Sequence, residues 1–329
     1  MTKNKLKKVL IIKLGALGDV VHTTIIATAI KQTHPDWEVH FLTQRGLESV
    51  LQNHPHIDKV YTWQKRPKDS FKQYKRLLKI LFNQRYDFVF NITSAIRNIL
   101  ISCLIFPKHI RHKKMRGNSW VEDYFLIAKS AIKDLELPER LYLGVEPNAD
   151  EKINELLKDY PRPYFAFAPG GATNRSRQGR IWNIEKWKEL TQKLKNKYGG
   201  TVFVCGSQIE SEVHSQLEQD NVVILSGQFS IQESSVLLSK MDLMISGDTG
   251  PIHIASAHNI TTLAILGSTS PDKIKPYGKN GHYISYDGDC KYCWEKQCKK
   301  LTQGQAYTPC MEGITSDMIM EKIEKENLV

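Results

Sequence analysis

The sequence lacks the features of a secreted or membrane-spanning chain. The lysines of the first eight residues are followed by only a short apolar run before Lys13, which is too little for a signal peptide. The longest apolar stretch, residues 99–106, falls well short of the roughly 20 residues that a membrane span needs. Only six cysteines occur among 329 residues, which favours reduced thiols over a disulfide framework. We therefore expect a cytoplasmic protein.

The first half of the chain has few acidic residues relative to its basic ones. The net charge is +11, and residues 1–150 hold 25 Lys and Arg against 14 Asp and Glu, whereas residues 151–329 hold 21 of each kind. The basic residues are densest in residues 65–79 and 108–116. Either run alone is compatible with a solvated helix face. Their confinement to one half favours a polyanionic partner such as a phosphorylated substrate or an anionic membrane surface. No nucleic-acid recognition motif accompanies the charge, so we expect no nucleic-acid partner.

Short apolar runs alternate with amphipathic stretches through the whole chain, which is typical of βαβ units and parallel sheets. Strands are predicted at residues 9–13, 39–43, 60–62, 88–91, 164–168, 201–205, 222–225, 243–246 and 262–266. Helices are predicted at residues 20–33, 46–53, 71–84, 120–135, 150–160, 184–197, 209–218, 231–240 and 251–258. Prolines interrupt the pattern between residues 138 and 163. The fold class is therefore α/β, with two Rossmann-like doubly wound domains, 1–150 and 151–329, facing a central cleft.

The first candidate site is the segment K-L-G-A-L-G-D-V, residues 13–20, directly after the first predicted strand. Gly15 and Gly18 permit a tight turn from strand to helix. Asp19 then stands at the start of the helix, where a carboxylate could act as general base toward an acceptor hydroxyl. The alternative is that Asp19 only caps the helix.

The two common nucleotide-binding fingerprints are missing. The glycine spacing is G-x-x-G rather than G-x-G-x-x-G, and the second predicted strand ends near Thr43 without an acidic residue to hold a ribose. No G-K-[ST] follows the glycines, which excludes a P-loop. Binding of NAD at this turn is therefore not expected.

Two further strand-to-helix turns lie in the second half. The segment A-P-G-G-A-T-N, residues 168–174, contains Gly171 and Thr173 and is followed by three arginines that end with Arg180. Backbone amides and guanidinium groups of this kind suit a diphosphate. The segment S-G-D-T-G-P-I-H, residues 246–253, suits phosphate and sugar hydroxyls at a helix N-terminus. Its candidate residues are Asp248, Thr249, Gly250 and His253.

Together these segments resemble the ADP-heptose:lipopolysaccharide heptosyltransferases, family nine of the glycosyltransferases, which have the GT-B fold. The resemblance covers nearly the whole chain and includes R-I-W-N-I-E-K-W and L-G-S-T-S-P. It implies an inverting, metal-independent transfer of heptose from ADP-heptose to the inner core of lipopolysaccharide or lipooligosaccharide. It also implies an N-terminal acceptor-binding domain and a C-terminal donor-binding domain. The acceptor is an anionic lipid-linked oligosaccharide, so peripheral attachment to the inner face of the inner membrane is expected.

The resemblance implies a role for individual residues. Asp19 matches the catalytic base, and Arg180 matches a basic residue, often lysine in the family, that neutralises the donor diphosphate. Glu210 matches a ribose-binding acid and Phe229 an adenine contact. The remaining donor-binding residues are Gly15, Gly18, Gly171, Thr173, Asp248, Thr249, Gly250 and His253.

Several alternatives stay open on the sequence alone. The chain could use another nucleotide sugar or a protein acceptor, or it could be a nucleotide-sugar epimerase. It could also bind a nucleotide sugar without turnover, although retention of Asp19 argues against that. The base of the donor, the acceptor and the linkage position are not determined.

Four cysteines cluster near the end of the chain. Cys290, Cys293, Cys298 and Cys310 have the spacing C-x2-C-x4-C-x11-C. Four thiols so placed could hold a structural zinc or iron ion, and a protein-modifying branch of the family carries a four-cysteine iron site. The alternative is a set of free thiols around a loop. No cofactor is expected to be needed for catalysis.

Overall fold

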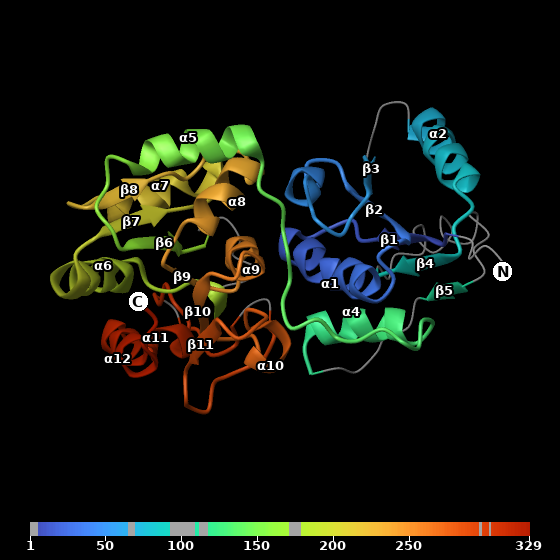
Figure 1. The fold of residues 1–329 in the computed structure, drawn as a ribbon. Helices are drawn as coiled ribbons and strands as arrows, with labels where there is room; N and C mark the ends of the chain where they lie inside the picture. The colour runs from blue at the N-terminus through green and yellow to red at the C-terminus, as the bar shows by residue number, and fades with distance from the viewer. Residues whose placement is uncertain are drawn as a thin grey trace. The chain divides into compact units, whose positions relative to one another are not determined.

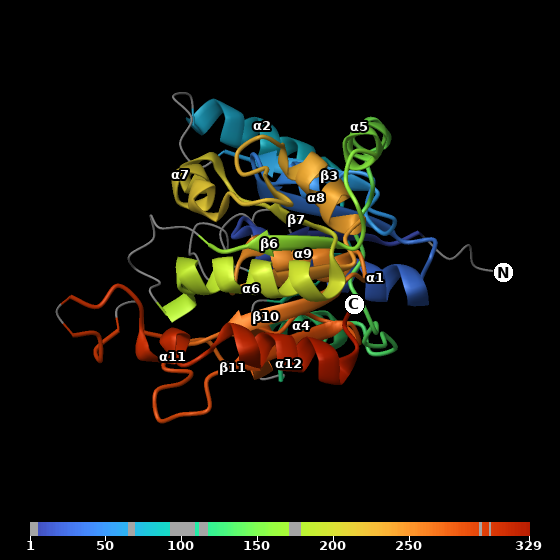
Figure 2. The same ribbon diagram turned by 90° about the vertical axis from the view of Figure 1, so that its left-hand side faces the viewer.

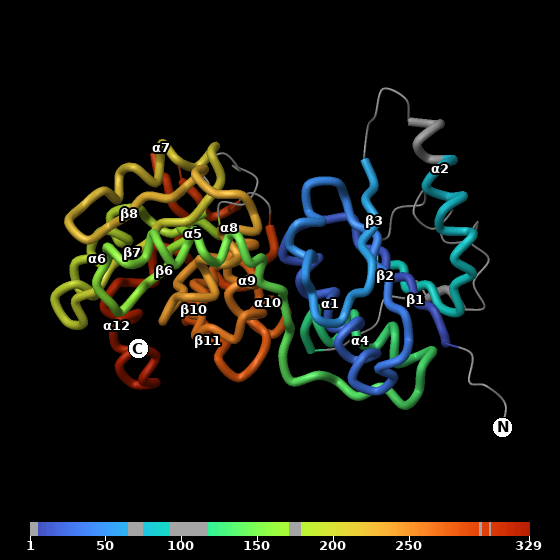
Figure 3. Tube along the Cα trace, turned by 45° about the horizontal axis from the view of Figure 1, so that its top comes forward, coloured from blue at the N-terminus to red at the C-terminus, as the bar shows by residue number. Residues whose placement is uncertain are grey.

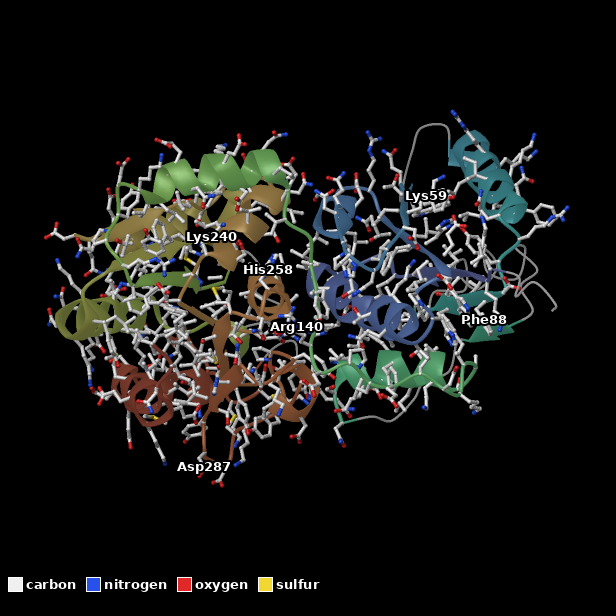
Figure 4. The ribbon with its side chains drawn as sticks, viewed as in Figure 1. Lys59, Phe88, Arg140, Lys240, His258 and Asp287 are labelled. Atoms are coloured by element: carbon white, nitrogen blue, oxygen red, sulfur yellow. The ribbon has the colours of Figure 1, made fainter. Side chains whose placement is uncertain are left out.

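The computed structural model describes residues 6–64, 70–92, 109–111, 118–170, 179–295, 298–302 and 304–329. The chain divides into two compact units, Met1–Gly144 and Val145–Val329. The connection runs from helix α4 (Trp120–Lys129) to helix α5 (Pro147–Leu157), as Figure 3 shows. The division falls a few residues before the expected boundary at 150. The reason is that α5 packs against α8 (Ile231–Ser239), and Lys240 at the end of α8 (Figure 4) pairs with Asp150 at 2.6 Å.

The first unit is built on a parallel five-stranded sheet with the order β3-β2-β1-β4-β5 (Figure 1). The strands are β1 (Lys8–Ile12), β2 (Glu38–Gln44), β3 (Lys59–Trp63), β4 (Phe88–Asn91) and β5 (His109–Arg111). The helices are α1 (Leu17–Thr33), α2 (Ser70–Asn83) and α4, with a 3-10 turn at Glu48–Leu51. Strand β5 was not predicted.

The central strand of this sheet is apolar because helices or neighbouring strands cover it on every side. Val9, Leu10, Ile11 and Ile12 are all fully buried, as is typical of parallel sheets covered on both faces. Helix α1 packs against α4 and is buried along most of its length. Ser119 begins α4, where its hydroxyl accepts from the amide of Glu122, a standard N-terminal cap.

The second unit is built on a parallel six-stranded sheet with the order β11-β10-β9-β6-β7-β8. The strands are β6 (Tyr164–Ala168), β7 (Thr201–Val204), β8 (Val222–Ile224), β9 (Leu243–Ser246), β10 (Thr261–Leu266) and β11 (Gly281–Ser285). The helices besides α5 and α8 are α6 (Ile184–Tyr198), α7 (Ser211–His214), α9 (Gly250–Ala257), α10 (Pro271–Ile274), α11 (Pro309–Glu312) and α12 (Ser316–Glu326).

Helices α6 and α12 lie side by side on one face of this sheet (Figure 2). Their apolar side chains form a single core with alternate residues of β6. Phe167 contacts Trp187 of α6 with ring centroids 4.7 Å apart, and Ile319 and Ile323 of α12 belong to the same cluster. Burial of side chains of this size contributes about 1.5–3 kcal/mol each.

Three predicted elements differ in the structure. The predicted helix 209–218 is broken into 3-10 turns at Gln208–Glu210 and Ser215–Leu217 around the single-turn helix α7. Residues 46–53 form a 3-10 turn rather than a longer helix, and α4 ends at Lys129 rather than at 135. Strand β11 and helices α10, α11 and α12 were not predicted. Among the described residues, no helix has both the length and the apolarity needed to span a bilayer.

Candidate active site

In each unit, a predicted site motif follows the strand at which the strand order reverses. In the first unit, β1 lies between β2 and β4, and the chain continues from it through residues 13–16 into α1. In the second unit, β6 lies between β7 and β9, so the turns after β6 and β9 open at neighbouring strand ends. Ligands of doubly wound sheets bind at such switch points, at the carboxyl ends of the strands.

Asp19 lies in the first turn of α1 and contacts two side chains. Its Oδ2 atom is 3.3 Å from Nζ of Lys13, and its Oδ1 atom accepts a hydrogen bond of 3.2 Å from the hydroxyl of Tyr124. Lys13 also donates to the Tyr124 hydroxyl at 3.2 Å. The Asp19 side chain is 38% exposed, whereas that of Lys13 is 9% exposed. The carboxylate is therefore held by buried partners and remains accessible to a ligand.

Tyr124 is a hydrogen-bond donor in this arrangement. Burial raises the pKa of its hydroxyl well above the ordinary value, and the neighbouring Asp19 carboxylate raises it further. The hydroxyl is therefore protonated at any physiological pH. The alternative that Asp19 caps α1 with its side chain is not observed, because Ala16 is the cap residue and receives no side-chain hydrogen bond.

The two turns of the second unit are connected by hydroxyl groups. Ala168 and Ser246 are register partners at the ends of β6 and β9. The Ser246 hydroxyl donates to the Ala168 carbonyl at 2.8 Å and lies 2.7 Å from Oγ1 of Thr249. Gly170 has a φ of +87°, with Thr249 beside it. This backbone conformation favours glycine.

Arg180 and Asp248 form an ion pair, with 2.9 Å between Nη1 and Oδ2. The close approach of the Arg180 backbone to the turn after β9 depends on Gly247, because a Cβ atom there would meet the Arg180 carbonyl oxygen at 2.7 Å. Nε2 of His253 lies 3.9 Å from Oδ1 of Asp248, which is beyond hydrogen-bonding distance. The structure thus brings Arg180, Asp248 and His253 together next to Thr249 and Gly250 at the N-terminus of α9.

Glu210 and Phe229 lie at the ends of the next two strands. Glu210 is in the 3-10 turn after β7, where its carboxylate accepts from the Ser207 amide at 2.8 Å and from the Ser207 hydroxyl at 2.7 Å. Phe229 is in the turn after β8, with Nζ of Lys152 5.2 Å from its ring centroid. Gly171 and Thr173 lie outside the described residues. So do three basic residues of the run 65–79 and four of the run 108–116: Lys65, Arg66, Lys68, Lys108, Lys113, Lys114 and Arg116.

The four cysteines that could hold a structural zinc or iron ion lie in the loop after β11 and in α11. Within the described residues, which include all four cysteines, no three His, Cys, Asp or Glu side chains are placed to hold a metal ion. Burial and the thiols of Cys290, Cys293 and Cys298 raise the pKa of the Cys310 thiol, so the four are neighbours. Cys310 is buried beside Thr308, with 3.3 Å between Sγ and Oγ1, whereas Cys293 is exposed.

The same loop contains D-G-D at residues 287–289. Asp287 lies at an exposed position after β11 (Figure 4) and pairs with Lys291 at 2.9 Å. Its carboxylate is therefore part of a solvent-exposed turn.

Sequence comparison decides the family. The model of glycosyltransferase family 9 (heptosyltransferase) matches residues 101–303. The chain belongs to glycosyltransferase family 9. This glycosyltransferase is 25% identical over 299 residues to lipopolysaccharide heptosyltransferase 1 of Campylobacter coli, covering 80% of this chain and 84% of that protein. It is 24% identical over 305 residues to the lipopolysaccharide core heptosyltransferase OpsX of Haemophilus influenzae, covering 85% of this chain and 84% of that protein.

Solved structures confirm the fold of this glycosyltransferase. Escherichia coli ADP-heptose lipopolysaccharide heptosyltransferase II superposes with a TM-score of 0.77 at 18% identity, covering 97% of this chain and 98% of that one. The family 9 glycosyltransferase of Veillonella parvula gives a TM-score of 0.79 at 16% identity, covering 97% and 96%. The fold of this glycosyltransferase is therefore that of the GT-B heptosyltransferases, as the sequence motifs predict.

The candidate sites of the two units include residues that sequence reasoning did not single out. Lys13 stands inside the first motif, but nothing in the pattern predicts that its ammonium group contacts Asp19. Tyr124 lies on α4, which is remote from Asp19 in sequence, so only the packing of α4 on α1 brings them together. Ser246 was part of the third motif without an assigned role.

Proposed function

We propose that this glycosyltransferase transfers a heptose, with inversion, from ADP-heptose to the inner core of lipopolysaccharide or lipooligosaccharide. The observation that carries the proposal is the pairing of Arg180 with Asp248 at the N-terminus of α9. The names of the relatives support the substrate class. E. coli heptosyltransferase WaaC, which shares the fold, is described in structures with ADP and with ADP-2-deoxy-2-fluoro heptose.

The chemistry at the donor end is stabilisation of a departing diphosphate. As the bond between the sugar and the phosphate breaks, negative charge develops on ADP. Guanidinium and helix N-terminal amide groups stabilise such charge without a metal ion. Arg180 and the start of α9 supply these groups, while Asp248 and Thr249 are suited to bond sugar hydroxyls or phosphate. Glu210 would hold the ribose, and Phe229 would contact the adenine.

The chemistry at the acceptor end is removal of a proton. An acceptor hydroxyl attacks the anomeric carbon as Asp19 takes its proton, and the electron pair of the breaking bond leaves with ADP. A positioned general base of this kind typically contributes 10²–10⁴-fold to the rate. The partly exposed Asp19 carboxylate supports this assignment.

The acceptor is an anionic lipid-linked oligosaccharide in this proposal, bound by the basic first unit. Helix α2 supports it: Leu77, Leu78 and Leu81 pack toward the core of the unit, and the opposite face carries exposed Lys75, Arg76 and Lys79. Two large apolar side chains, Ile80 and Phe82, are exposed beside them, at 37% and 52%. Basic and apolar side chains combined in this way favour an anionic membrane surface, so we propose peripheral attachment at the cytoplasmic face of the inner membrane.

The donor is tested first, by thermal shift with ADP, UDP, GDP, CMP, NAD and ADP-heptose. A ligand at 100 times its Kd stabilises the native state by about 2.7 kcal/mol, which raises Tm by a few degrees in a chain of this size. We expect a shift with ADP and ADP-heptose alone. A shift with UDP or GDP would mean that the donor carries that nucleotide instead of ADP. A response to NAD alone would overturn the proposal.

The acceptor is then tested by incubating the enzyme with ADP-heptose and heptose-deficient inner-core lipooligosaccharide. The expected product is heavier by one heptose and has the anomeric configuration opposite to that of the donor. Donor binding without any transfer to this acceptor would contradict the proposed acceptor.

A further inference from the structure

Three contacts close a ring around the carboxylate of Asp19. Lys13 donates to the oxygen of Tyr124, the Tyr124 hydroxyl donates to Oδ1 of Asp19, and Oδ2 faces the ammonium group of Lys13. An ammonium group has only donors, whereas a phenol has one proton and accepting lone pairs. Because Lys13 occupies Tyr124 as a donor, the single phenolic proton must point to Asp19. The direction of every bond in the ring is therefore fixed.

Tyr124 and Lys13 are themselves held firmly. They are 8% and 7% exposed, and the Lys13 ammonium group lies 4.9 Å from the centroid of the Tyr124 ring. A buried ammonium group without partners would cost several kcal/mol, so this lysine stays where its two oxygen partners are. Asp19, at 38% exposure, is the only open member of the three.

We infer that Tyr124 and Lys13 are positioning residues, which orient the Asp19 carboxylate toward the acceptor hydroxyl through this ring of contacts. The inference rests on the proposed role of Asp19 as the base. Each carboxylate oxygen keeps a second lone pair after it accepts from Tyr124 or faces Lys13, so one remains for the acceptor proton. Because Tyr124 and Lys13 hold both carboxylate oxygens of Asp19, the carboxylate does not rotate freely. The lone pair that remains for the acceptor proton therefore keeps pointing toward the exposed side of Asp19. Misplacement of a catalytic group by about 1 Å can cost on the order of 10²-fold in rate.

The test is Tyr124→Phe, which removes one hydroxyl and keeps the ring beside Lys13. We expect kcat to fall by about tenfold or more, equivalent to about 1.4 kcal/mol of transition-state stabilisation. The KM for ADP-heptose and the Kd for ADP should not change. Lys13→Met, of similar length, should lower kcat further with the same unchanged donor KM.

The matched control is Tyr86→Phe. Tyr86 is also buried in the first unit, and its hydroxyl bonds Nδ1 of His40 at 2.8 Å rather than Asp19. This variant loses an equally buried hydroxyl, so it should retain the parent kcat within about twofold once its folded fraction is measured. An equal loss of kcat in both tyrosine variants would overturn the inference, since the effect would be structural.

A double-mutant cycle separates this inference from the proposed base. In an Asp19→Asn background, measured by single turnover at high enzyme concentration, Tyr124→Phe should cause no further loss. Asp19→Asn without transfer, together with a parent-like kcat for Tyr124→Phe, would overturn the inference and leave the base assignment intact. Transfer at the parent rate by Asp19→Asn would instead refute the base assignment. An equal loss from Tyr124→Phe in both backgrounds would also overturn the inference.

Discussion

The guanidinium group of Arg180 is neutralised by the carboxylate of Asp248, with 2.9 Å between Nη1 and Oδ2. The two residues approach the site from different sides, one before α6 and one between β9 and α9. Both side chains are largely buried, at 22% and 10% exposure, so neither charge is fully solvated. A guanidinium group presents five N–H donors in a planar fork, a geometry that suits a donor diphosphate.

Replacing Arg180 with Ala should weaken ADP binding by about 10- to 100-fold, because charge-assisted hydrogen bonds contribute about 1.5–3 kcal/mol. It also leaves the Asp248 carboxylate without its partner beside the phosphates. Isothermal titration with ADP measures the effect. The control is Arg162→Ala, which breaks the exposed pair with Asp242 in the same unit and should leave the Kd unchanged. An unaltered Kd for the Arg180 variant would contradict its role.

Asp19→Asn should lower kcat by about 10²–10⁴-fold, since an amide cannot accept the acceptor proton. The amide retains the size of the carboxylate, so folding and ADP binding should be preserved. Steady-state transfer and ADP titration measure the two effects. The matched control is Asp36→Asn at an exposed position beyond α1, for which we expect parent kinetics.

Gly170→Ala should destabilise the second unit by about 1 kcal/mol and weaken ADP binding, because an L-residue is strained at a φ of +87°. Gly199→Ala is the matched control: Gly199 also has positive φ, at +68°, and ends α6. Chemical denaturation should show a loss of stability in both variants. Only the Gly170 variant should have a raised Kd for ADP, and weakened binding in both would show that strain alone lowers affinity.

Acidification should destabilise the second unit through His258, which lies at the end of α9 (Figure 4). Burial lowers the pKa of His258 from 6.5 to about 4. Below pH 6.5 the unfolded chain binds a proton that the folded one does not, so stability is lost as pH falls from 6.5 toward 4. The slope is about 1.4 kcal/mol per pH unit.

The His258→Gln variant should lose this pH dependence of stability, because glutamine does not titrate. Its side chain can still bond the Ser235 hydroxyl, which lies 2.8 Å from Nε2 of His258 in the parent protein. Urea denaturation of both proteins at pH 7, 6 and 5 measures it. If the free energy of unfolding changed equally with pH in the two proteins, protonation of His258 would not destabilise the folded state.

Replacing Lys75, Arg76 and Lys79 with Gln should weaken binding to vesicles that contain anionic phosphatidylglycerol. Each basic residue near such a surface contributes about 1 kcal/mol, so three amount to about 10²-fold at low salt. Vesicle sedimentation measures binding, and phosphatidylcholine vesicles provide the baseline. The control carries the same charge change on α6, at Lys188, Lys195 and Lys197, and should bind like the parent. Equal binding by both triple variants would contradict a role for α2.

Most of the fold could be predicted from the sequence because apolar periodicity is local. The predicted strands at 88–91, 164–168 and 243–246 match β4, β6 and β9 residue for residue. The elements that were missed are β5, β11, α10, α11 and α12. Most of them are short, and α11 and α12 follow the irregular cysteine loop. In place of the predicted helix 209–218, a capping box of Ser207 and Glu210 begins a 3-10 turn that is followed by the short helix α7 and a second 3-10 turn.

The sequence by itself determined the two-unit α/β organisation, the family and the three motifs, because glycines, turn residues and alternation act within a few positions of one another. Only the tertiary structure decided which side chains meet. The contact of Tyr124 with Asp19 depends on the packing of α4 against α1, and that of Arg180 with Asp248 depends on Gly247 admitting a backbone carbonyl. It also decided the environments of the cysteines, because burial of Cys310 and exposure of Cys293 follow from how the chain packs and not from the spacing.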